Sequence, residues 1–348
     1  MEYRVLGRTG LRVSVLGVGT WQLSGPVEVG GLPDGFPDPG RASVVRLIQE
    51  CHDLGINVVD TAEGYGDGEG ERRVADAIRG RRDAWVVVTK LGLRRGPNGA
   101  RIRDASPSMI AASLEGSLRR LGTDYVDVYL YHTPPGREQM LAGLEVLQRL
   151  REHGKIRFHG ISTNDLSTLR ALTQHQAIEV IMFSQSLLTH PEETLELVRR
   201  HDLGSLVRGA FERGLLTGKY FQVPPRFSGE DIRSHALKTR DFARYRVCEQ
   251  LLPAGGDMVC LALRYLLDFD TTHTIVLGAK SVSDYRRALR ALTLPRLGED
   301  VQARIRQVRS QLMAADRKER LMGSGWLRRM GRLVASGLRS LIASRSRV

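Results

Sequence analysis

Segments typical of strands and segments typical of helices alternate along most of the chain, and this alternation restricts the fold more than any other feature. Between residues 13 and 292, eight short apolar runs each precede a segment with apolar residues at helical spacing. The runs are apolar on both faces, which is typical of parallel strands covered by helices. Eight such pairs favour closure into a barrel over an open sheet. We therefore predict an α/β protein with a (β/α)8 TIM barrel over residues 1–297.

The expected elements can be assigned in chain order. The barrel strands are Val13–Trp21, Ile56–Val59, Trp85–Thr89, Val126–Tyr131, Phe158–Ser162, Glu179–Phe183, Ser205–Ala210 and Thr274–Leu277. The helices are Arg41–Leu54, Glu71–Arg79, Pro107–Leu121, Met140–His153, Leu166–His175, Pro191–Arg200, Asp257–Leu267 and Val282–Leu292. An N-terminal β-hairpin precedes them, with strands Tyr3–Leu6 and Leu11–Ser14. Three long loops, Gln22–Gly40, Leu93–Asp104 and Phe211–Gly256, are expected to carry the choice of substrate.

The excess positive charge is concentrated at the C-terminus. The net charge is +13, and the segment from Arg320 onward holds seven arginines and no acid, which leaves +6 for residues 1–319. No zinc finger, helix-turn-helix or ribonucleoprotein motif accompanies this charge. We therefore expect no nucleic-acid partner.

Cysteine usage and hydropathy argue against a metal-binding, a secreted and a membrane-spanning protein. The three cysteines form no C-x-x-C or His/Cys cluster, so we expect neither a metal site nor a secreted disulfide framework. The N-terminus lacks the apolar core of a signal peptide, and no run reaches the roughly 18 apolar residues of a spanning helix. We expect a cytoplasmic protein.

Four residues with complementary chemistry follow successive predicted strands, at the end of a barrel where active sites lie. They are Asp60, Tyr65, Lys90 and His132. A lysine ammonium lowers the pKa of a neighbouring phenol, and a carboxylate keeps that ammonium charged and oriented. His132 can orient a carbonyl oxygen toward the phenol. Each residue alone also has a structural interpretation, such as Asp60 capping a helix, but four together favour proton delivery to a carbonyl.

Several strings resemble the aldo-keto reductase family, in order over residues 3–295: GRTGLRVSVLGVGTW, GINVVDTAEGYGDGEGERRVADAI, VVVTKLG, SLEGSLRRLGTDYVDVYLYH, GKIRFHGIS, RGLLTGKY and TIVLGAKS. The resemblance implies a (β/α)8 barrel that reduces aldehydes or ketones with NADPH, an oxidoreductase of class EC 1.1.1.-. By position, Tyr65 resembles the general acid, Lys90 and Asp60 the pair that lowers its pKa, and His132 the residue that orients the carbonyl.

The resemblance also implies cofactor contacts, with departures from the family pattern. The implied cofactor-binding residues are Gly19, Thr20, Trp21, Ser162, Thr163, Gln185, Arg208, Gly278, Lys280 and Ser281. Thr163 replaces an asparagine that holds the nicotinamide amide, and Gln185 aligns with a tyrosine that stacks under the ring. Lys280 is the natural partner of a 2′-phosphate. We expect NADPH, with NADH as the alternative.

The chain continues beyond the predicted barrel. We expect a C-terminal helix over 298–322 and, over 323–348, a basic amphipathic extension whose residues 326–348 carry an apolar stripe between arginines. This extension is either a peripheral membrane or partner contact, or a helix packed on its own barrel or a disordered tail.

The function expected from these observations is NAD(P)H-dependent reduction of a small-molecule carbonyl compound. A non-catalytic, cofactor-sensing barrel resembling channel β subunits and a cofactor-retaining epimerase or eliminase are the alternatives. The basic stretch within Phe211–Gly256 is either a solvated face or a lid over an anionic or polyhydroxylated substrate. The sequence predicts no oligomeric state.

Overall fold

The computed structural model of the chain describes residues 1–174 and 177–323. Their backbone divides into two compact units, Met1–Leu297 and a second that begins at Gly298. The first unit contains every residue of the candidate site.

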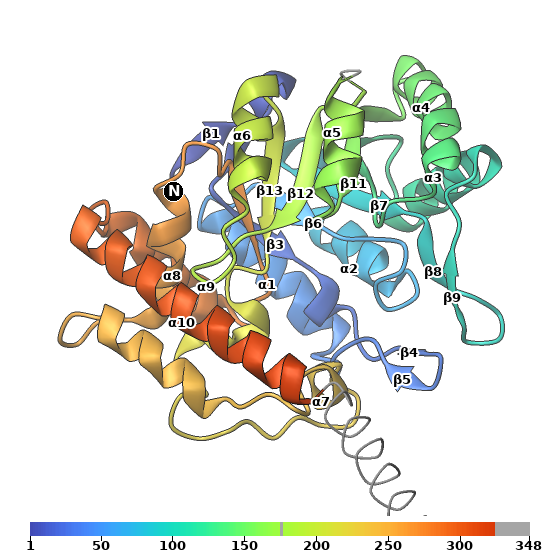
Figure 1. Ribbon diagram of the computed structural model, residues 1–348. Helices are drawn as coiled ribbons and strands as arrows, with labels where there is room; N and C mark the ends of the chain where they lie inside the picture. Colours follow the sequence, from blue (N-terminus) through green and yellow to red (C-terminus); the bar gives the residue numbers. More distant parts are fainter. Residues whose placement is uncertain (175–176, 324–348) are drawn as a thin grey trace, which may run out of the picture. The chain divides into compact units, whose positions relative to one another are not determined.

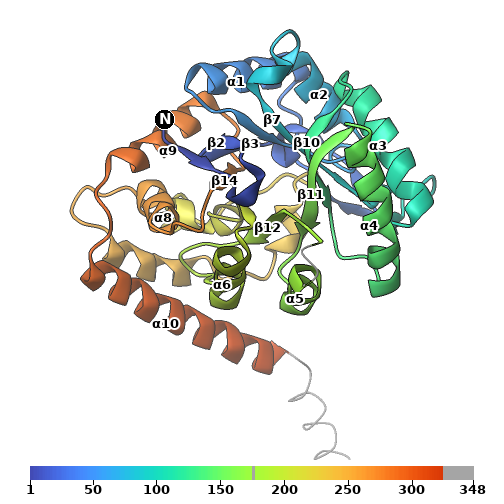
Figure 2. The same cartoon turned by 90° about the horizontal axis from the view of Figure 1, so that it is seen from above.

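Eight parallel strands close into a barrel in the first unit (Figures 1 and 2). In chain order the barrel strands are β3 (Leu16–Gly19), β6 (Val58–Asp60), β7 (Val86–Leu91), β10 (Val126–Tyr131), β11 (Ile156–Ser162), β12 (Val180–Ser184), β13 (Gly204–Arg208) and β14 (Thr274–Leu277). Each pairs with its neighbours in sequence, and β14 pairs with β3 to close the ring. The predicted α/β barrel is therefore confirmed.

A helix follows each barrel strand, and the helices surround the barrel when it is viewed along its axis (Figure 2). They are α1 (Arg41–Asp53), α2 (Glu69–Ile78), α3 (Pro107–Leu121), α4 (Arg137–Glu152), α5 (Leu166–Gln174), α6 (Glu192–His201), α8 (Met258–Leu267) and α9 (Val282–Leu289). The predicted end of the fifth helix, His175, lies outside the described residues. Helix α8 is buried along its whole length, in keeping with its continuous apolar sequence MVCLALRYLL.

The N-terminal hairpin closes one end of the barrel. Its strands β1 (Tyr3–Val5) and β2 (Arg12–Ser14) pair in antiparallel register, as predicted. Leu6, Leu11 and Val13 join the buried valines of the barrel interior in one apolar core. The backbone of the hairpin turn contacts the start of β13, so it lies at the amino ends of the strands. A ligand must therefore enter from the carboxyl ends.

Two of the three predicted loops contain short hairpins that the sequence did not indicate. The first loop forms β4 (Glu28–Val29) and β5 (Leu32–Pro33), and the second forms β8 (Leu93–Arg95) and β9 (Arg101–Arg103). Their strands are too short to show an alternating pattern. The two hairpins stabilise each other, since Gly30 N–H donates to Gly99 O over 2.8 Å. The third loop contains α7 (Arg233–Ala236) and 3-10 turns.

The second unit contains helix α10 (Glu299–Gly323), which covers the predicted helix 298–322. The predicted basic extension lies outside the described residues from residue 324 onward. Within the described part of the chain, no helix is long and apolar enough to cross a membrane.

Candidate active site

The turn after β6 carries the predicted general acid. Asp60 is the last residue of β6, and Tyr65 follows in a turn that leads into α2. Gly66 has φ +57°, and a Cβ at this position would lie 2.1 Å from Ser24 O. Glycine is thus required for the turn to pack against the first loop. This packing holds Tyr65 at the carboxyl end of the barrel.

Three of the four predicted catalytic side chains meet around one ammonium group. Lys90 Nζ, in β7, lies 2.6 Å from Asp60 Oδ1 and donates to Tyr65 Oη over 3.1 Å. It also donates to Thr61 O over 2.7 Å, so the ammonium makes two hydrogen bonds besides the ion pair with Asp60. The side chains of Lys90 and Asp60 are only 1% and 6% exposed. The buried charge of Lys90 is therefore paired and its position is fixed.

Within this group, the pKa of Tyr65 differs from the value expected from the sequence. Burial acts against the charge of Lys90, but Asp60 and the Tyr65 oxygen together raise the pKa of the ammonium above its ordinary value. Burial also raises the pKa of the Tyr65 phenol, and the opposing effect of Lys90 does not cancel it. We expected a lowered pKa for Tyr65, but desolvation outweighs the effect of the nearby cation. Tyr65 is therefore protonated at neutral pH and available as an acid.

Two rings flank the phenol of Tyr65. The His132 ring lies edge-on to it with centroids 5.4 Å apart, and the Trp21 ring is stacked at 6.3 Å. Burial and the cations Lys90 and Arg208 hold the pKa of His132 well below its ordinary value, so its imidazole is neutral. His132 Nδ1 is buried and has no hydrogen-bond partner among the described residues. The structure therefore brings His132 beside Tyr65, as a neutral group able to orient a carbonyl.

A cavity of about 740 Å³ opens at the carboxyl ends of the strands. The predicted site residues that line it are Gly19, Trp21, Asp60, Tyr65, Arg208, Gly278 and Lys280. The predicted residues outside its lining are Thr20, Lys90, His132, Ser162, Thr163, Gln185 and Ser281. Lys90 and His132 nevertheless lie beside Tyr65, which lines the cavity.

Two of the predicted cofactor residues are used within the protein instead. Gln185 is completely buried, and its Oε1 accepts from Thr272 Oγ1 over 3.4 Å. Thr20 is also buried and its hydroxyl donates to Asp60 O over 3.0 Å. Gln185 Nε2 is buried and has no hydrogen-bond partner among the described residues, so the predicted contact with a nicotinamide ring stays a prediction. Met182 and Ser184, from the preceding strand β12, line the cavity.

One residue of the first loop that lines the cavity was not predicted from the sequence. Phe36 lines it, with its ring 5.2 Å from Trp21 and 4.9 Å from Lys280 Nζ. Ile232 N–H, in the third loop, donates to Gly35 O over 2.9 Å, so two loops distant in sequence join at this point. An aromatic residue in a Gly- and Pro-rich loop was the available signal.

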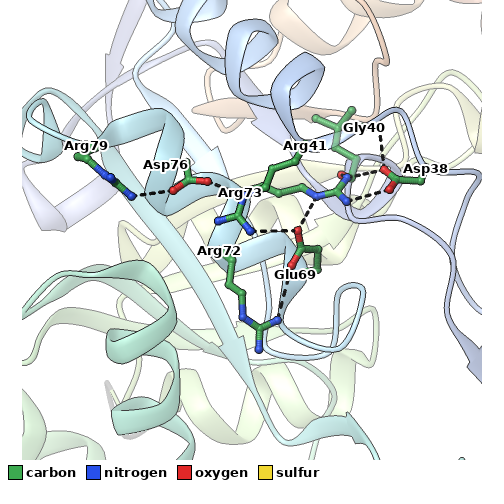
Figure 3. Close-up of polar contacts among 9 residues, drawn as sticks. Asp38, Gly40, Arg41, Glu69, Arg72, Arg73, Asp76 and Arg79 are labelled. Carbon is green, nitrogen blue, oxygen red and sulfur yellow. Dashed lines mark hydrogen bonds and ion pairs between the residues drawn. The ribbon is translucent and has the colours of Figure 1, made fainter.

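A buried arginine fastens the first loop to α2 (Figure 3). Arg73 Nη1 lies 2.7 Å from Asp38 Oδ1, and its Nε lies 3.0 Å from Glu69 Oε1. Nη1 of the same residue also donates to Leu23 O over 2.8 Å, in the turn that carries Trp21. Arg73 therefore holds both Trp21 and the segment around Phe36 near the cavity.

The end of the cavity at β14 suits an anionic group. Lys280 lies in the turn between β14 and the N-terminus of α9, where backbone N–H groups favour anions. Asp284 in the first turn of α9 opposes this effect, but its charge is offset by Lys219 at 3.7 Å. The whole lining contains more cations (Arg208, Arg213, Lys219, Arg233, Arg240, Lys280 and Arg287) than acids (Asp60, Glu212 and Asp284). The donor set therefore fits a phosphate-bearing cofactor.

Comparison with known proteins agrees with the fold. The model of the aldo/keto reductase family matches residues 15–310. The chain is 31% identical over 295 residues to aldo-keto reductase YhdN of Bacillus subtilis, covering 80% of this chain and 85% of that protein. It is also 31% identical over 313 residues to NADH-specific methylglyoxal reductase of Escherichia coli, covering 83% and 93%.

A solved structure shows the same architecture. The holo form of an aldo-keto reductase from Bacillus halodurans matches with a TM-score of 0.75 at 28% identity, over 88% of this chain and 96% of that one. The extent of these matches covers the barrel and every candidate site residue. The chain therefore belongs to the aldo/keto reductase family of oxidoreductases.

Proposed function

We propose that this protein reduces the carbonyl group of an aldehyde or ketone to an alcohol, with Tyr65 as the proton donor. The observation that carries the proposal is that Tyr65 lines the cavity and that its hydroxyl lies 3.1 Å from the buried ammonium of Lys90. Membership of the family implies NAD(P)H as the cofactor. When bound, this cofactor supplies the hydride that adds to the carbonyl carbon.

The side chains of the protein orient the carbonyl oxygen and stabilise the negative charge that develops on it. The neutral imidazole of His132 donates a hydrogen bond that orients this oxygen toward Tyr65. As negative charge develops on the oxygen, the Tyr65 hydroxyl transfers its proton and becomes a phenolate. Lys90 stabilises that phenolate, and Asp60 keeps Lys90 charged throughout. Proton delivery by a positioned acid is worth roughly 10² to 10⁴ in rate.

NADPH is the cofactor we propose. Lys280 supports this choice because it is a cation in the turn of β14 with no carboxylate within ion-pair distance among the described residues. A 2′-phosphate would supply the anion that this turn lacks. NADH is the alternative, since one similar protein is an NADH-specific reductase. Dissociation constants for NADPH and NADH, measured by fluorescence titration, decide between them.

The decisive experiment follows oxidation of NADPH with a panel of carbonyl compounds that begins with methylglyoxal, the substrate named for a similar protein. Wild type is compared with Tyr65→Phe, and Tyr131→Phe serves as the matched control. Tyr131 is also buried, but its hydroxyl has no hydrogen-bond partner in the described structure. We expect alcohol formation that Tyr65→Phe reduces at least 100-fold and Tyr131→Phe leaves nearly unchanged.

Other outcomes would replace the proposal. Tight NADPH binding without Tyr65-dependent turnover of any carbonyl compound would support a cofactor-sensing barrel. Product formation without net consumption of NADPH would support an epimerase or eliminase that retains its cofactor.

A further inference from the structure

A second cation lies near the Tyr65 hydroxyl, and the chemistry described above does not use it. Arg208 ends β13 and lines the same cavity as Asp60 and Tyr65. Its charge acts on the titration of Tyr65, Asp60 and His132, whereas Lys280 is coupled instead to Arg233 and Asp231. Arg208 therefore belongs to the reacting end of the cavity, away from the β14 turn.

Neutral side chains hold the guanidinium of Arg208 in position. Its Nη1 donates to Ser184 Oγ over 2.7 Å, and its Nη2 lies 3.5 Å from Asn164 Oδ1. Asn164 is itself fixed, because Ser184 N–H donates to its Oδ1 over 2.8 Å. The three residues come from the carboxyl ends of β11, β12 and β13. This arrangement orients the guanidinium without neutralising it.

No described carboxylate lies within ion-pair distance of Arg208. The two acids coupled to it are engaged elsewhere, since Asp60 pairs with Lys90 at 2.6 Å and Glu212 accepts from Ser186 Oγ over 2.6 Å. Glu212 also accepts from Thr189 Oγ1 over 2.7 Å. Burial lowers the pKa of Arg208, which marks a charge that has lost water without gaining a counter-ion.

The turn after Arg208 has an unusual backbone. Glu212 and Arg213 both have positive φ, 46° and 59°, which is uncommon for residues other than glycine. Such strain persists where surrounding contacts impose it and clusters at ligand sites. In this turn the Glu212 carboxylate accepts from two hydroxyls, while Arg208 lines the cavity.

On these grounds, and resting on the proposed carbonyl reduction, we propose that Arg208 binds an anionic group, carboxylate or phosphate, carried by the carbonyl substrate. A guanidinium with free donors forms paired hydrogen bonds with either anion. The substrate class is thus aldehydes or ketones bearing a carboxylate or phosphate. The neighbouring cations of the lining favour the same charge.

The test uses pairs of aldehydes that differ in charge. Succinic semialdehyde is compared with its methyl ester, and glyceraldehyde 3-phosphate with glyceraldehyde, in wild type and Arg208→Gln. Loss of one charge-assisted contact with the substrate lowers kcat/KM by about 10- to 100-fold. For at least one pair, we expect Arg208→Gln to lower kcat/KM of the anionic member by that factor beyond its effect on the neutral partner. The pair that responds identifies the anion.

The affinity for NADPH is measured on the same variants, with Lys280→Gln as the comparison. The family resemblance implied that Arg208 contacts the cofactor, whereas this proposal assigns it to the substrate, so we expect Arg208→Gln to raise the dissociation constant of NADPH less than Lys280→Gln does. Equal losses for charged and neutral aldehydes, or NADPH binding weakened by Arg208→Gln as much as by Lys280→Gln, would overturn the assignment. Tyr65-dependent reduction of the neutral aldehydes tests the proposed function separately.

Binding without turnover gives an independent result. Succinate and inorganic phosphate are titrated calorimetrically into the wild-type protein saturated with NADPH, and into Arg208→Gln. Binding of either anion that the substitution weakens at least 10-fold supports the subsite. Absence of binding, or binding that the substitution leaves unchanged, contradicts it.

Discussion

The catalytic group and the β14 turn each contain a lysine, and the two lysines differ in whether a counter-ion is present. In the catalytic group of Asp60, Tyr65, Lys90 and His132, the ammonium of Lys90 is buried and fully paired. In the β14 turn, Gly278–Ser281, the ammonium of Lys280 lies 4.9 Å from the ring of Phe36 and has no carboxylate within ion-pair distance among the described residues. The first group is complete before any ligand arrives, whereas the second requires a ligand for its counter-charge. We infer that the first is organised for chemistry and the second for binding.

Breaking the charge pair of the catalytic group has the largest expected effect. Lys90→Met leaves Asp60 buried without a cation, which costs about 3 to 5 kcal/mol of unfolding free energy. Activity falls as well, by about 10² to 10⁴, because the Tyr65 phenolate loses its stabilising charge. Urea unfolding and kcat measure the two effects.

The double variant Asp60→Asn, Lys90→Met is the control for that change. We expect it to recover most of the lost stability, since no charge remains buried, but none of the activity. Equal stability of the single and double variants would show that the pair is not coupled.

A substitution in the β14 turn should change cofactor binding and leave stability nearly unchanged. Lys280→Gln is expected to weaken NADPH binding about 10-fold, through one lost charge-assisted contact. Its unfolding free energy should change by less than about 0.5 kcal/mol, because the side chain is exposed. NADH affinity serves as the control, and an equal loss for both cofactors would remove the 2′-phosphate as the ligand of Lys280.

The loop over the cavity should show a smaller effect. Asp38→Ala removes one anchor of Arg73, although Glu69 and Leu23 O remain. Because the Asp38 side chain is 46% exposed, we expect a loss of about 1 kcal/mol or less. KM should rise a few-fold as Trp21 and Phe36 become less well held, while kcat stays constant. A fall in kcat with constant KM would place the effect on the chemical step.

The smallest expected effect is the change of kcat/KM with pH. Reduction requires protonated Tyr65, whose pKa is raised, and neutral His132, whose pKa is well below the ordinary range. Neither group changes protonation near neutrality, so kcat/KM should vary by less than about twofold between about pH 6.5 and 9. The rate should fall only on the alkaline side, as Tyr65 loses its proton above the ordinary tyrosine value of about 10. A transition centred near pH 7 would contradict these directions.

The sequence could predict the barrel because its periodicity and its parallel strands have the same physical cause, burial of both strand faces. The proximity of Asp60, Tyr65 and Lys90 also followed, since parallel strands bring their carboxyl ends to one edge. Which way a side chain points at that edge depends on register and local turns. For this reason the sequence did not show that the Gln185 side chain lies buried against Thr272.

The sequence also could not predict pKa values that depend on burial or contacts between distant segments. The raised pKa of Tyr65 results from desolvation outweighing Lys90, a balance that spacing along the chain does not reveal. The two hairpins of the long loops, and the clamp of Arg73 on Asp38, depend on contacts between segments far apart in sequence. Loop residues without periodic pattern give no signal for such contacts.

The contrast between chemistry and binding can be tested in one paired measurement. The single-turnover rate of carbonyl reduction and the dissociation constant of NADPH are determined for wild type, Tyr65→Phe and Lys280→Gln. Our account predicts that Tyr65→Phe loses at least 100-fold in rate at unchanged NADPH affinity, and that Lys280→Gln loses affinity at unchanged rate with saturating cofactor. Both variants losing rate and affinity together would contradict it.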